Sequence, residues 1–334
     1  MPSPERVTLA QIAGQAGVSL TTISKVLNGG PDVAAGTRAR IEDLLQRSGY
    51  ERRRGERRDT AVEVVVPALD GHWALGVMDG VSEAAARRSL AVTLSVTGDA
   101  EGPGDEWARG VLRRRPAGVV LLSRGIPSPV REELRSRGIP FVVIDPAGDP
   151  APGLPCVGTA DWSGGVSAAR HLGELGHRHV AVMAADDRLL RLRARLDGFV
   201  AGMAEVGLPV EPDAVHRCGA TPESAADATH ALLEATSRPT AVFAVSDMRA
   251  FGVIAAARSR GMTVPGDLSV VGFDDVDVAG LSLPPLTTVR LPLRELGERA
   301  VALVLGDDGD APAWDLATSL VVRGTTAPPA SALT

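Results

Sequence analysis

Long hydrophobic runs are missing from this sequence of 334 residues. No apolar stretch reaches the roughly 20 residues that a membrane helix needs. The first residues, MPSPERVTLAQ, lack a basic start followed by an apolar core, so they do not predict a secretory signal. Cysteine is scarce as well, because only Cys156 and Cys218 are present, and their spacing indicates neither a disulfide framework nor a metal site. These absences predict a cytoplasmic protein with no membrane partner.

The motifs of common enzyme and metal-site classes are also missing. The sequence holds no Gly-x-Ser-x-Gly, His-Glu-x-x-His, Walker A or Gly-x-Gly-x-x-Gly pattern. His177 and His179 form a His-x-His pair, but they follow the helix-ending Gly176 and open a strand, which favours a structural role over a metal site. We therefore predict a protein that is not an enzyme and that uses no metal and no cofactor.

The net charge of −6 is unevenly distributed along the chain. Residues 1–60 carry 10 Lys/Arg against 7 Asp/Glu, whereas the remainder of the chain is acidic. A positive N-terminal part on an acidic body is typical of a nucleic-acid binder that also carries a domain of another kind.

Three parts follow from the residue pattern. Residues 1–50 hold short helix-sized segments, and residues 51–60, ERRRGERRDT, contain five arginines and no apolar residue. From residue 61 to 334, apolar runs such as AVEVVVPAL, AGVVLLSR and TAVFAVSD alternate with helical segments, in two sets of which the second starts near Gly158. Such alternation predicts parallel sheets covered on both faces.

We therefore expect an all-α headpiece, an arginine-rich linker and an α/β body of two parallel-sheet lobes. The first lobe is expected to take about 61–157 and 289–316. The second is expected to take about 158–288 and 317–324.

The stretch LAQIAGQAGVSLTTISKVLN predicts two short helices around a tight turn. Residues 10–16 form one helix that Thr8 can cap, and Gly17 ends it because glycine enters the left-handed region at little cost. Ser19 can cap the second helix, residues 20–27. The side chains expected to be buried in that helix are Ile23, Val26 and Leu27.

Three side chains remain on the outer face of the second helix: Leu20, Thr21 and Lys25. A helix-turn-helix needs such a face to enter the DNA major groove. An ordinary pair of core helices is the alternative interpretation.

The segment VTLAQIAGQAGVSLTTISKVLNGGPDVAAGTRARIEDLLQRSGY resembles the headpiece of lac repressor-like (LacI/GalR) transcription regulators. Further segments resemble the effector domain of that family in the same order: AARHLGELGHRHVAVM, RLDGFVAGMAEVGL, AVFAVSDMRAFGVIAAARSRGMTVPGDLSVVGFDD and PPLTTVRLPLRELGERAVALVL. The resemblance covers nearly the whole chain. It implies a periplasmic-binding-protein-like body, a homodimer on a near-palindromic operator, and a small molecule between the lobes that changes DNA affinity.

The resemblance also implies which headpiece residues touch DNA. Lys25 can donate to guanine, Thr21 can meet either base edge, and Leu20 can touch a thymine methyl group. The residues placed to bind phosphates or to cap helices are Thr8, Ser19, Thr22, Ser24 and Asn28. For Thr8 and Asn28, capping alone is the alternative.

The linker departs from the family pattern, Asn-x-x-Ala-x-x-Leu, whose leucine wedges into the minor groove. Neither that alanine nor that leucine is present in ERRRGERRDT. Its arginines can instead hold phosphates or enter a narrow minor groove, and a solvated linker is the alternative. These arginines are Arg52, Arg53, Arg54, Arg57 and Arg58.

Candidate effector residues follow the predicted strands, because ligands of open α/β sheets lie beyond the carboxyl ends of the strands. By this rule they are Asp70, Asp145, Asp274 and the pair Ser246-Asp247. The resemblance adds Arg195 as a residue that grips the ligand and Trp73 as a ring near it. For Asp247 and Asp275, helix capping or bonding between the lobes is the alternative.

These residue types indicate the class of effector. An aromatic ring stacks on a sugar or a base, and carboxylates and an arginine bind hydroxyl groups. The effector is therefore expected to be a sugar or a nucleoside- or purine-like molecule. Ser246 stands where relatives often have asparagine, which shortens one polar arm. A solute-binding protein is the alternative function, but it would need an export signal and no headpiece.

Overall fold

The structure is a computed structural model. It describes residues 9–27, 33–47, 61–69, 72–98, 102–123, 125–145, 153–185, 190–235, 238–307 and 313–330. Some predicted site residues lie outside these ranges, namely Thr8, Asn28, Asp70 and the five linker arginines. Within the described ranges, none of the helices combines the length and the apolar character that crossing a bilayer requires.

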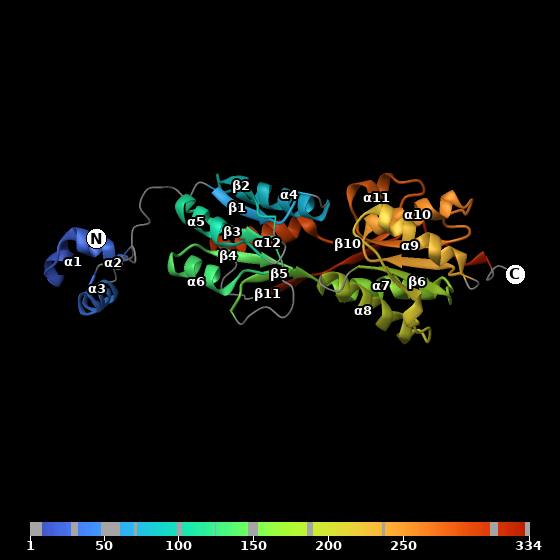
Figure 1. Ribbon diagram of the computed structural model, residues 1–334, viewed down its shortest axis with the longest axis horizontal. Helices are drawn as coiled ribbons and strands as arrows, with labels where there is room; N and C mark the ends of the chain where they lie inside the picture. Colours follow the sequence, from blue (N-terminus) through green and yellow to red (C-terminus); the bar gives the residue numbers. More distant parts are fainter. Residues whose placement is uncertain are drawn as a thin grey trace, which may run out of the picture. The chain divides into compact units, whose positions relative to one another are not determined.

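The headpiece is a three-helix unit: α1 (Leu9–Ala16), α2 (Leu20–Leu27) and α3 (Ala35–Arg47) (Figure 1). Gly17 ends α1 with φ of 65°, as predicted, and the amide of Val18 donates to Ala13 O at 3.1 Å. The three helices bury one small core, formed by Ile12, Ala13, Ala16, Ile23, Val26 and Ile41. The predicted helix-turn-helix and the burial of Ile23 and Val26 are confirmed, with α1 starting one residue earlier than expected.

The first lobe of the body is built on a six-stranded sheet, in the order β11-β5-β4-β3-β1-β2. Its strands are β1 (Ala61–Val66), β2 (Ala91–Val96), β3 (Gly118–Leu121), β4 (Phe141–Ile144), β5 (Cys156–Thr159) and β11 (Ala313–Leu316). The helices α4 (His72–Ala86) and α12 (Leu293–Leu305) pack on one face, and α5 (Asp105–Arg114) and α6 (Ser128–Ser136) pack on the other. Apolar strands covered on both faces fit the continuous apolar runs of the sequence.

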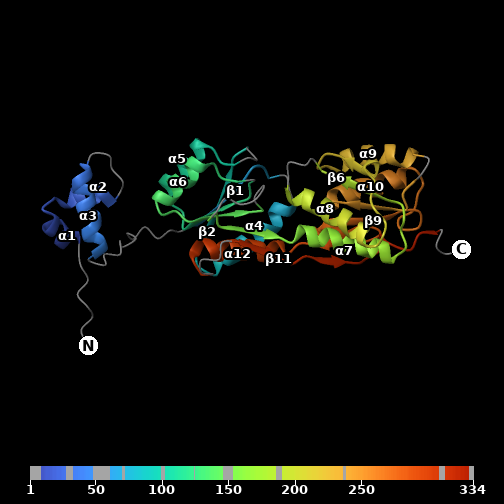
Figure 2. The same ribbon diagram turned by 90° about the horizontal axis from the view of Figure 1, so that it is seen from below.

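The second lobe repeats this plan with the order β12-β10-β9-β8-β6-β7. Its strands are β6 (Val180–Ala184), β7 (Val215–Arg217), β8 (Ala241–Ala244), β9 (Ser269–Asp274), β10 (Thr287–Arg290) and β12 (Ser319–Val321). Its helices are α7 (Asp161–Glu174), α8 (Leu190–Glu205), α9 (Pro222–Glu234), α10 (Asp247–Ser259) and α11 (Asp277–Leu281), with the 3-10 turn η1 (Pro212–Ala214). Figure 2 shows α7 and α8 lying together beside this sheet, and their side chains share one core with it.

The chain crosses between the lobes three times: after β5, after β10 and after β11. The predicted parallel sheets are confirmed, and the one antiparallel pair among the described strands is at an edge, where β12 pairs with β10. Only Ala317 and Thr318 separate β11 from β12. The chain thus enters the second sheet directly from β11 of the first lobe, and not through a helical crossover within its own sheet.

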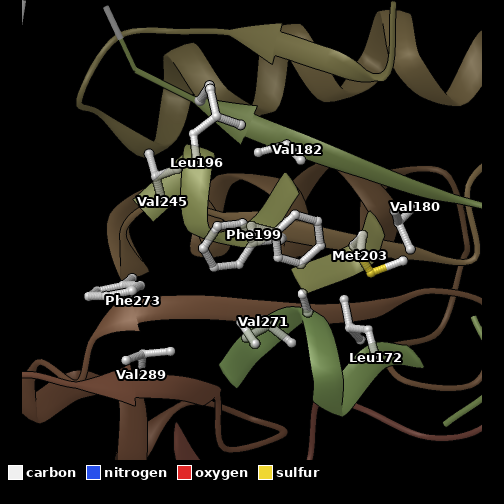
Figure 3. Packing of buried hydrophobic residues seen from close by; sticks show 14 of the residues in the cluster. Leu172, Val180, Val182, Leu196, Phe199, Met203, Val245, Val271, Phe273 and Val289 are labelled. Carbon is white, nitrogen blue, oxygen red and sulfur yellow. The ribbon is translucent and has the colours of Figure 1, made fainter. Parts of the chain in front are cut away.

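Glycines allow α7 and α8 to approach closely. A Cβ atom on Gly165 would lie 2.2 Å from Arg195 O, and one on Gly198 would lie 2.0 Å from Trp162 O. Below this contact, Phe199 stacks on Phe243 with ring centroids 4.4 Å apart, and Figure 3 shows Phe199 among Val182, Met203 and other apolar side chains. This packing fixes the N-terminal end of α7 beside the first turns of α8.

Candidate nucleic-acid interface and ligand site

The outer face of α2 carries the predicted base-reading side chains. Leu20 is 53% exposed, and Thr21, Ser24 and Lys25 are exposed as well. On the opposite face, Ile23 and Val26 fill the headpiece core. An exposed leucine beside polar side chains on a short helix is an arrangement that fits base edges in a major groove.

Ser19 caps α2, as the sequence predicts. Its Oγ accepts a hydrogen bond from the amide of Thr22 at 3.2 Å and lies 2.9 Å from the hydroxyl of Thr22. The cap satisfies an amide that would otherwise lack a partner at the helix start. It also leaves the first turn of α2, with its positive end of the helix dipole, at the surface.

A buried arginine organises the junction between the two lobes of the body. Arg195, on α8, is 1% exposed, and its guanidinium binds two carboxylates: Nε lies 2.7 Å from Asp161 Oδ1 and Nη1 lies 2.8 Å from Asp274 Oδ1. Nη1 also donates to Val245 O at 2.9 Å, and the guanidinium lies over the ring of Phe273, 4.0 Å from its centroid. Burial alone would lower the pKa of Arg195, but Asp274 and Asp161 outweigh it and raise that pKa. Arg195 therefore stays charged.

Three aspartates at strand ends have left-handed backbones. Asp145 follows β4 with φ of 47°, Asp274 ends β9 with φ of 117°, and Asp275 has φ of 57°. Each such residue costs on the order of 1–3 kcal/mol, and strain of this kind is concentrated at functional sites. In this conformation Asp274 binds Arg195 at 2.8 Å, while Asp275 binds Arg290 at 2.5 Å and Arg323 at 2.6 Å.

Ser246 and Asp247 bond to neighbouring protein groups, which corresponds to the capping role given above as the alternative for Asp247. Ser246 caps α10, and its hydroxyl accepts hydrogen bonds from the amide and from Nη1 of Arg249. Asp247 is fully buried, and its oxygens accept from Val276 N at 2.9 Å and from the Thr288 hydroxyl at 2.5 Å. Burial, followed by Asp274, raises the pKa of Asp247 to about 8. By these contacts Asp247 holds the loop after β9, and Asp275 binds arginines of its own lobe.

The first lobe contributes Trp73 and Asp145. The Trp73 ring, on α4, is covered by Arg191 of α8, whose guanidinium lies 4.4 Å from the ring centroid. Trp73 packs against the cores of both lobes, so this contact lies at their junction. Burial and then Asp161 raise the pKa of Asp145 to about 7.

Among the described residues, several buried polar atoms at this junction have no hydrogen-bond partner. They are Trp73 Nε1, Asp145 Oδ2, Arg191 Nε, Arg195 Nη2 and Arg249 Nε. An unpaired buried polar group costs about 1–3 kcal/mol, so a cluster of them is evidence for a missing partner. Sequence reasoning found Asp145, Asp274, Arg195 and Trp73, and the fold brings all four to the junction.

Sequence reasoning missed Asp161, Arg191 and Arg249. Asp161 follows β5 by two residues, so the strand-end rule was able to find it. Arg191 is four residues before Arg195 and therefore lies on the same face of α8. Arg249 gave no local signal, because only the cap at Ser246 turns it inward.

A groove of about 1010 Å³ is lined by residues of α4 and α12 and by Asp274 and Asp275. Surface ion pairs such as Arg87–Glu298 cross it. It lacks the unpaired buried atoms of the junction, and we therefore place the ligand site at the junction. Among the described residues, no group of three His, Cys, Asp or Glu side chains is arranged to hold a metal ion. His177 instead bonds to Thr240 and Ala327 O, the structural role that was expected.

Known proteins resemble this chain in sequence and in fold. The model of the bacterial regulatory protein family lacI matches residues 8–53, and that of a periplasmic binding protein-like domain matches residues 169–326. The HTH-type transcriptional regulator MalR of Streptomyces coelicolor is 35% identical over 335 residues, with 96% of each chain covered. A solved complex of the transcriptional regulator CelR with cellobiose is 28% identical, with a TM-score of 0.70 over 96% of this chain and 100% of that one. The lac repressor dimer bound to operator and the anti-inducer ONPF is 25% identical, with a TM-score of 0.70 over 97% and 100%.

Proposed function

Because the chain belongs to the lacI family of bacterial regulatory proteins, we propose that it represses transcription as a dimer and that a sugar, bound at the lobe junction, changes its operator affinity. The exposed face of α2 over a closed three-helix core is the observation that carries the DNA-binding part. The unpaired polar atoms at the junction support the ligand-binding part. The role is one of binding, and a DNA-bound regulator works in the cytoplasm, where the bacterial chromosome lies.

In the DNA complex, α2 enters the major groove. Lys25 donates to guanine, Thr21 meets a base edge, and Leu20 contacts a thymine methyl group. Polar residues around the turn bind phosphates and fix the register of α2 on the duplex, and these are Thr8, Ser19, Thr22, Ser24 and Asn28. Two headpieces on one two-fold dimer require half-sites about one helical turn apart.

Lys25 provides a direct test, because it is the single lysine of the chain. An amine-reactive reagent therefore labels only Lys25 and the chain terminus, and mass spectrometry separates the two. Operator fragments selected from genomic DNA should protect Lys25 and leave the terminus as the internal control. Equal labelling of Lys25 with and without selected DNA would refute the proposed face of α2.

The linker arginines act through charge in this proposal, since their segment has no apolar side chain to wedge between bases. Each phosphate contact should steepen log K against log[salt] by about 0.9. Changing Arg52, Arg53, Arg54, Arg57 and Arg58 to serine should flatten that slope and leave base preference intact. An unchanged slope would mean that the linker is only a tether.

At the lobe junction, the sugar hydroxyls bind Asp145, Asp274 and the unpaired N–H of Arg195. The relative that binds cellobiose, and the general use of carboxylates and arginine for hydroxyl groups, support a sugar. Trp73 offers a ring face once Arg191 moves away from it. Ser246 and Asp247 act behind these residues by holding Arg249 and the loop after β9.

A thermal-shift screen of sugars tests this site, because a ligand that binds only the folded protein raises its Tm by mass action. The matched variant is Asp274→Asn, which keeps the shape of the side chain and removes its charge. A true effector should stabilise the wild type more than the variant and should change operator affinity. A sugar that raises both Tm values equally binds elsewhere.

A further inference from the structure

Two buried guanidinium groups lie at the carboxyl edge of the second sheet, anchored on consecutive residues. Arg195 Nη1 donates to Val245 O at 2.9 Å, and Arg249 Nη1 donates to the Ser246 hydroxyl at 3.0 Å. Arg249 Nη2 also donates to Cys218 O at 3.3 Å. The side chains are 1% and 5% exposed, so both cations are held inside the protein.

Within the described part of the chain, each of these groups retains one buried nitrogen without an acceptor: Nη2 of Arg195 and Nε of Arg249. Two of the neighbouring acceptors are already in use. Asp161 accepts from Arg195 and from the Thr159 hydroxyl, and Ser246 accepts twice from Arg249. Among the described residues, the unpaired buried polar atoms at the junction are four donor nitrogens and a single acceptor, Asp145 Oδ2 at the end of β4, so unpaired donors outnumber unpaired acceptors.

Charge points in the same direction. Arg195 is matched by two carboxylates, whereas the acceptors of Arg249 in the described part of the chain are a hydroxyl and a carbonyl. Arg249 also lies in the first turn of α10, a 13-residue helix whose N-terminal end carries a partial positive charge. Burial lowers the pKa of Arg249, and Cys218 and Asp274, which raise it, offset only part of that effect, so the cost of burying this charge is not fully compensated.

We infer that the effector carries an oxyanion, either a carboxylate or a phosphoryl group, which binds Arg249 and Arg195 at this edge. The inference rests on the ligand site proposed above and adds the chemical class of its ligand: a sugar acid or a sugar phosphate. A hydroxyl group brings a donor as well as acceptors, whereas an oxyanion brings acceptors only. Guanidinium groups bind carboxylate and phosphate with paired, charge-assisted hydrogen bonds.

The two ends of the site then have separate tasks. The oxyanion satisfies the unpaired N–H groups of Arg195 and Arg249. The hydroxyl groups of the same molecule reach Asp145 and Asp274, which are acceptors at the ends of β4 and β9. Asp274 does not repel the oxyanion strongly, because its charge is shared with Arg195.

The first arm of the test uses inorganic phosphate as the smallest oxyanion. Full-length protein is melted in phosphate and in chloride at equal ionic strength, for the wild type, Arg249→Gln and Arg258→Gln. Arg258 is an exposed residue of the same helix and is the matched control. Phosphate should raise the Tm of the wild type and of Arg258→Gln by a few degrees and should leave that of Arg249→Gln unchanged.

The second arm compares glucose, gluconate and glucose 6-phosphate, which distinguishes a carboxylate from a phosphoryl group. At least one charged member should stabilise the wild type at lower concentration than phosphate alone, and the Arg249→Gln variant should lose that response. Arg249→Lys keeps the charge but not the planar guanidinium, so it should retain part of the stabilisation by the charged sugar. It also keeps the test valid if Arg249→Gln folds poorly.

The inference is overturned if neither phosphate nor a charged sugar raises Tm in a way that depends on Arg249. Stabilisation by glucose alone, equal in Arg249→Gln, would overturn it and leave the sugar site standing. Conversely, a phosphate response that depends on Arg249, without a response to any sugar, would support the oxyanion and contradict the sugar part of the proposed function.

Discussion

The headpiece and the lobe junction solve the problem of recognition in opposite ways. In the headpiece, Leu20, Thr21 and Lys25 are exposed, and the core that holds α2 consists of other residues, such as Ile12 and Ile41. At the junction, the recognition residues are part of the interior, with Arg195 1% exposed and tied to Asp161 and Asp274. Binding and folding are therefore separable in the headpiece and coupled at the junction.

The largest effect should follow from removing Arg195. Arg195→Ala leaves the buried carboxylates of Asp161 and Asp274 without their cation, which costs about 3–5 kcal/mol of the free energy of unfolding. The change should also abolish the response to effector. Urea titration measures the loss as a lower midpoint at an unchanged m-value.

Arg193→Ala is the control on the same helix. Arg193 is 56% exposed and pairs with Asp197 at 3.4 Å, a surface pair worth about 0–1 kcal/mol. If Arg195→Ala costs no more than this control, the junction is not coupled to folding and the comparison fails.

Lys25→Ala tests the headpiece side of the comparison. It should weaken specific operator binding by about 1–3 kcal/mol if Lys25 reads guanine, and it should shift the free energy of unfolding by no more than about 0.5 kcal/mol. Fluorescence anisotropy on operator and on random DNA measures the first quantity, and thermal melting the second. An equal loss on both DNAs would reduce Lys25 to a phosphate contact.

Asp145→Asn tests whether the stability of the junction depends on pH through Asp145. The folded pKa of Asp145, raised to about 7 by burial and Asp161, exceeds its unfolded value of about 3.9. The protonated form is thus favoured in the folded state, and stability falls as pH rises from about 4 to about 7. The asparagine at this position cannot ionise. The free energy of unfolding of the variant should therefore rise relative to that of the wild type by at most about 1.4 kcal/mol for each pH unit in that window. Parallel Tm curves between about pH 5 and 7 would contradict the raised pKa.

The smallest effects concern the turn of the headpiece. Gly17→Ala should cost about 1 kcal/mol, because φ of 65° is unfavourable for alanine. Gly14→Ala, in the α1 interior with open space around its Cβ position, should instead stabilise by about 0.5–1 kcal/mol. Melting the headpiece by circular dichroism compares the two. If both substitutions changed the Tm in the same direction, the left-handed backbone of Gly17 would not be needed for the turn between α1 and α2.

Much of the fold and part of the ligand site were predictable. The turn at Gly17, the buried positions of α2 and the alternation of strands and helices are local patterns, and the structure confirms them. Strand ends correctly placed Asp145 and Asp274 at one junction. The antiparallel β12 was not predicted, because the direction of a strand depends on the route by which the chain reaches the sheet, which local sequence patterns do not reveal.

The sequence by itself determined the class of the molecule: a helix-turn-helix headpiece, an α/β body and the residue types that recognise DNA and ligand. These are properties of periodicity and of motif spacing, which act over a few residues. Only the tertiary structure decided which charges neutralise each other, because Arg195, Asp161 and Asp274 meet through the packing of α7 on α8 and the end of β9. It likewise gave Arg249, within the described ranges, a hydroxyl and a carbonyl as acceptors instead of a carboxylate, since hydrogen-bond partners inside a protein depend on distance in space and not on distance along the chain.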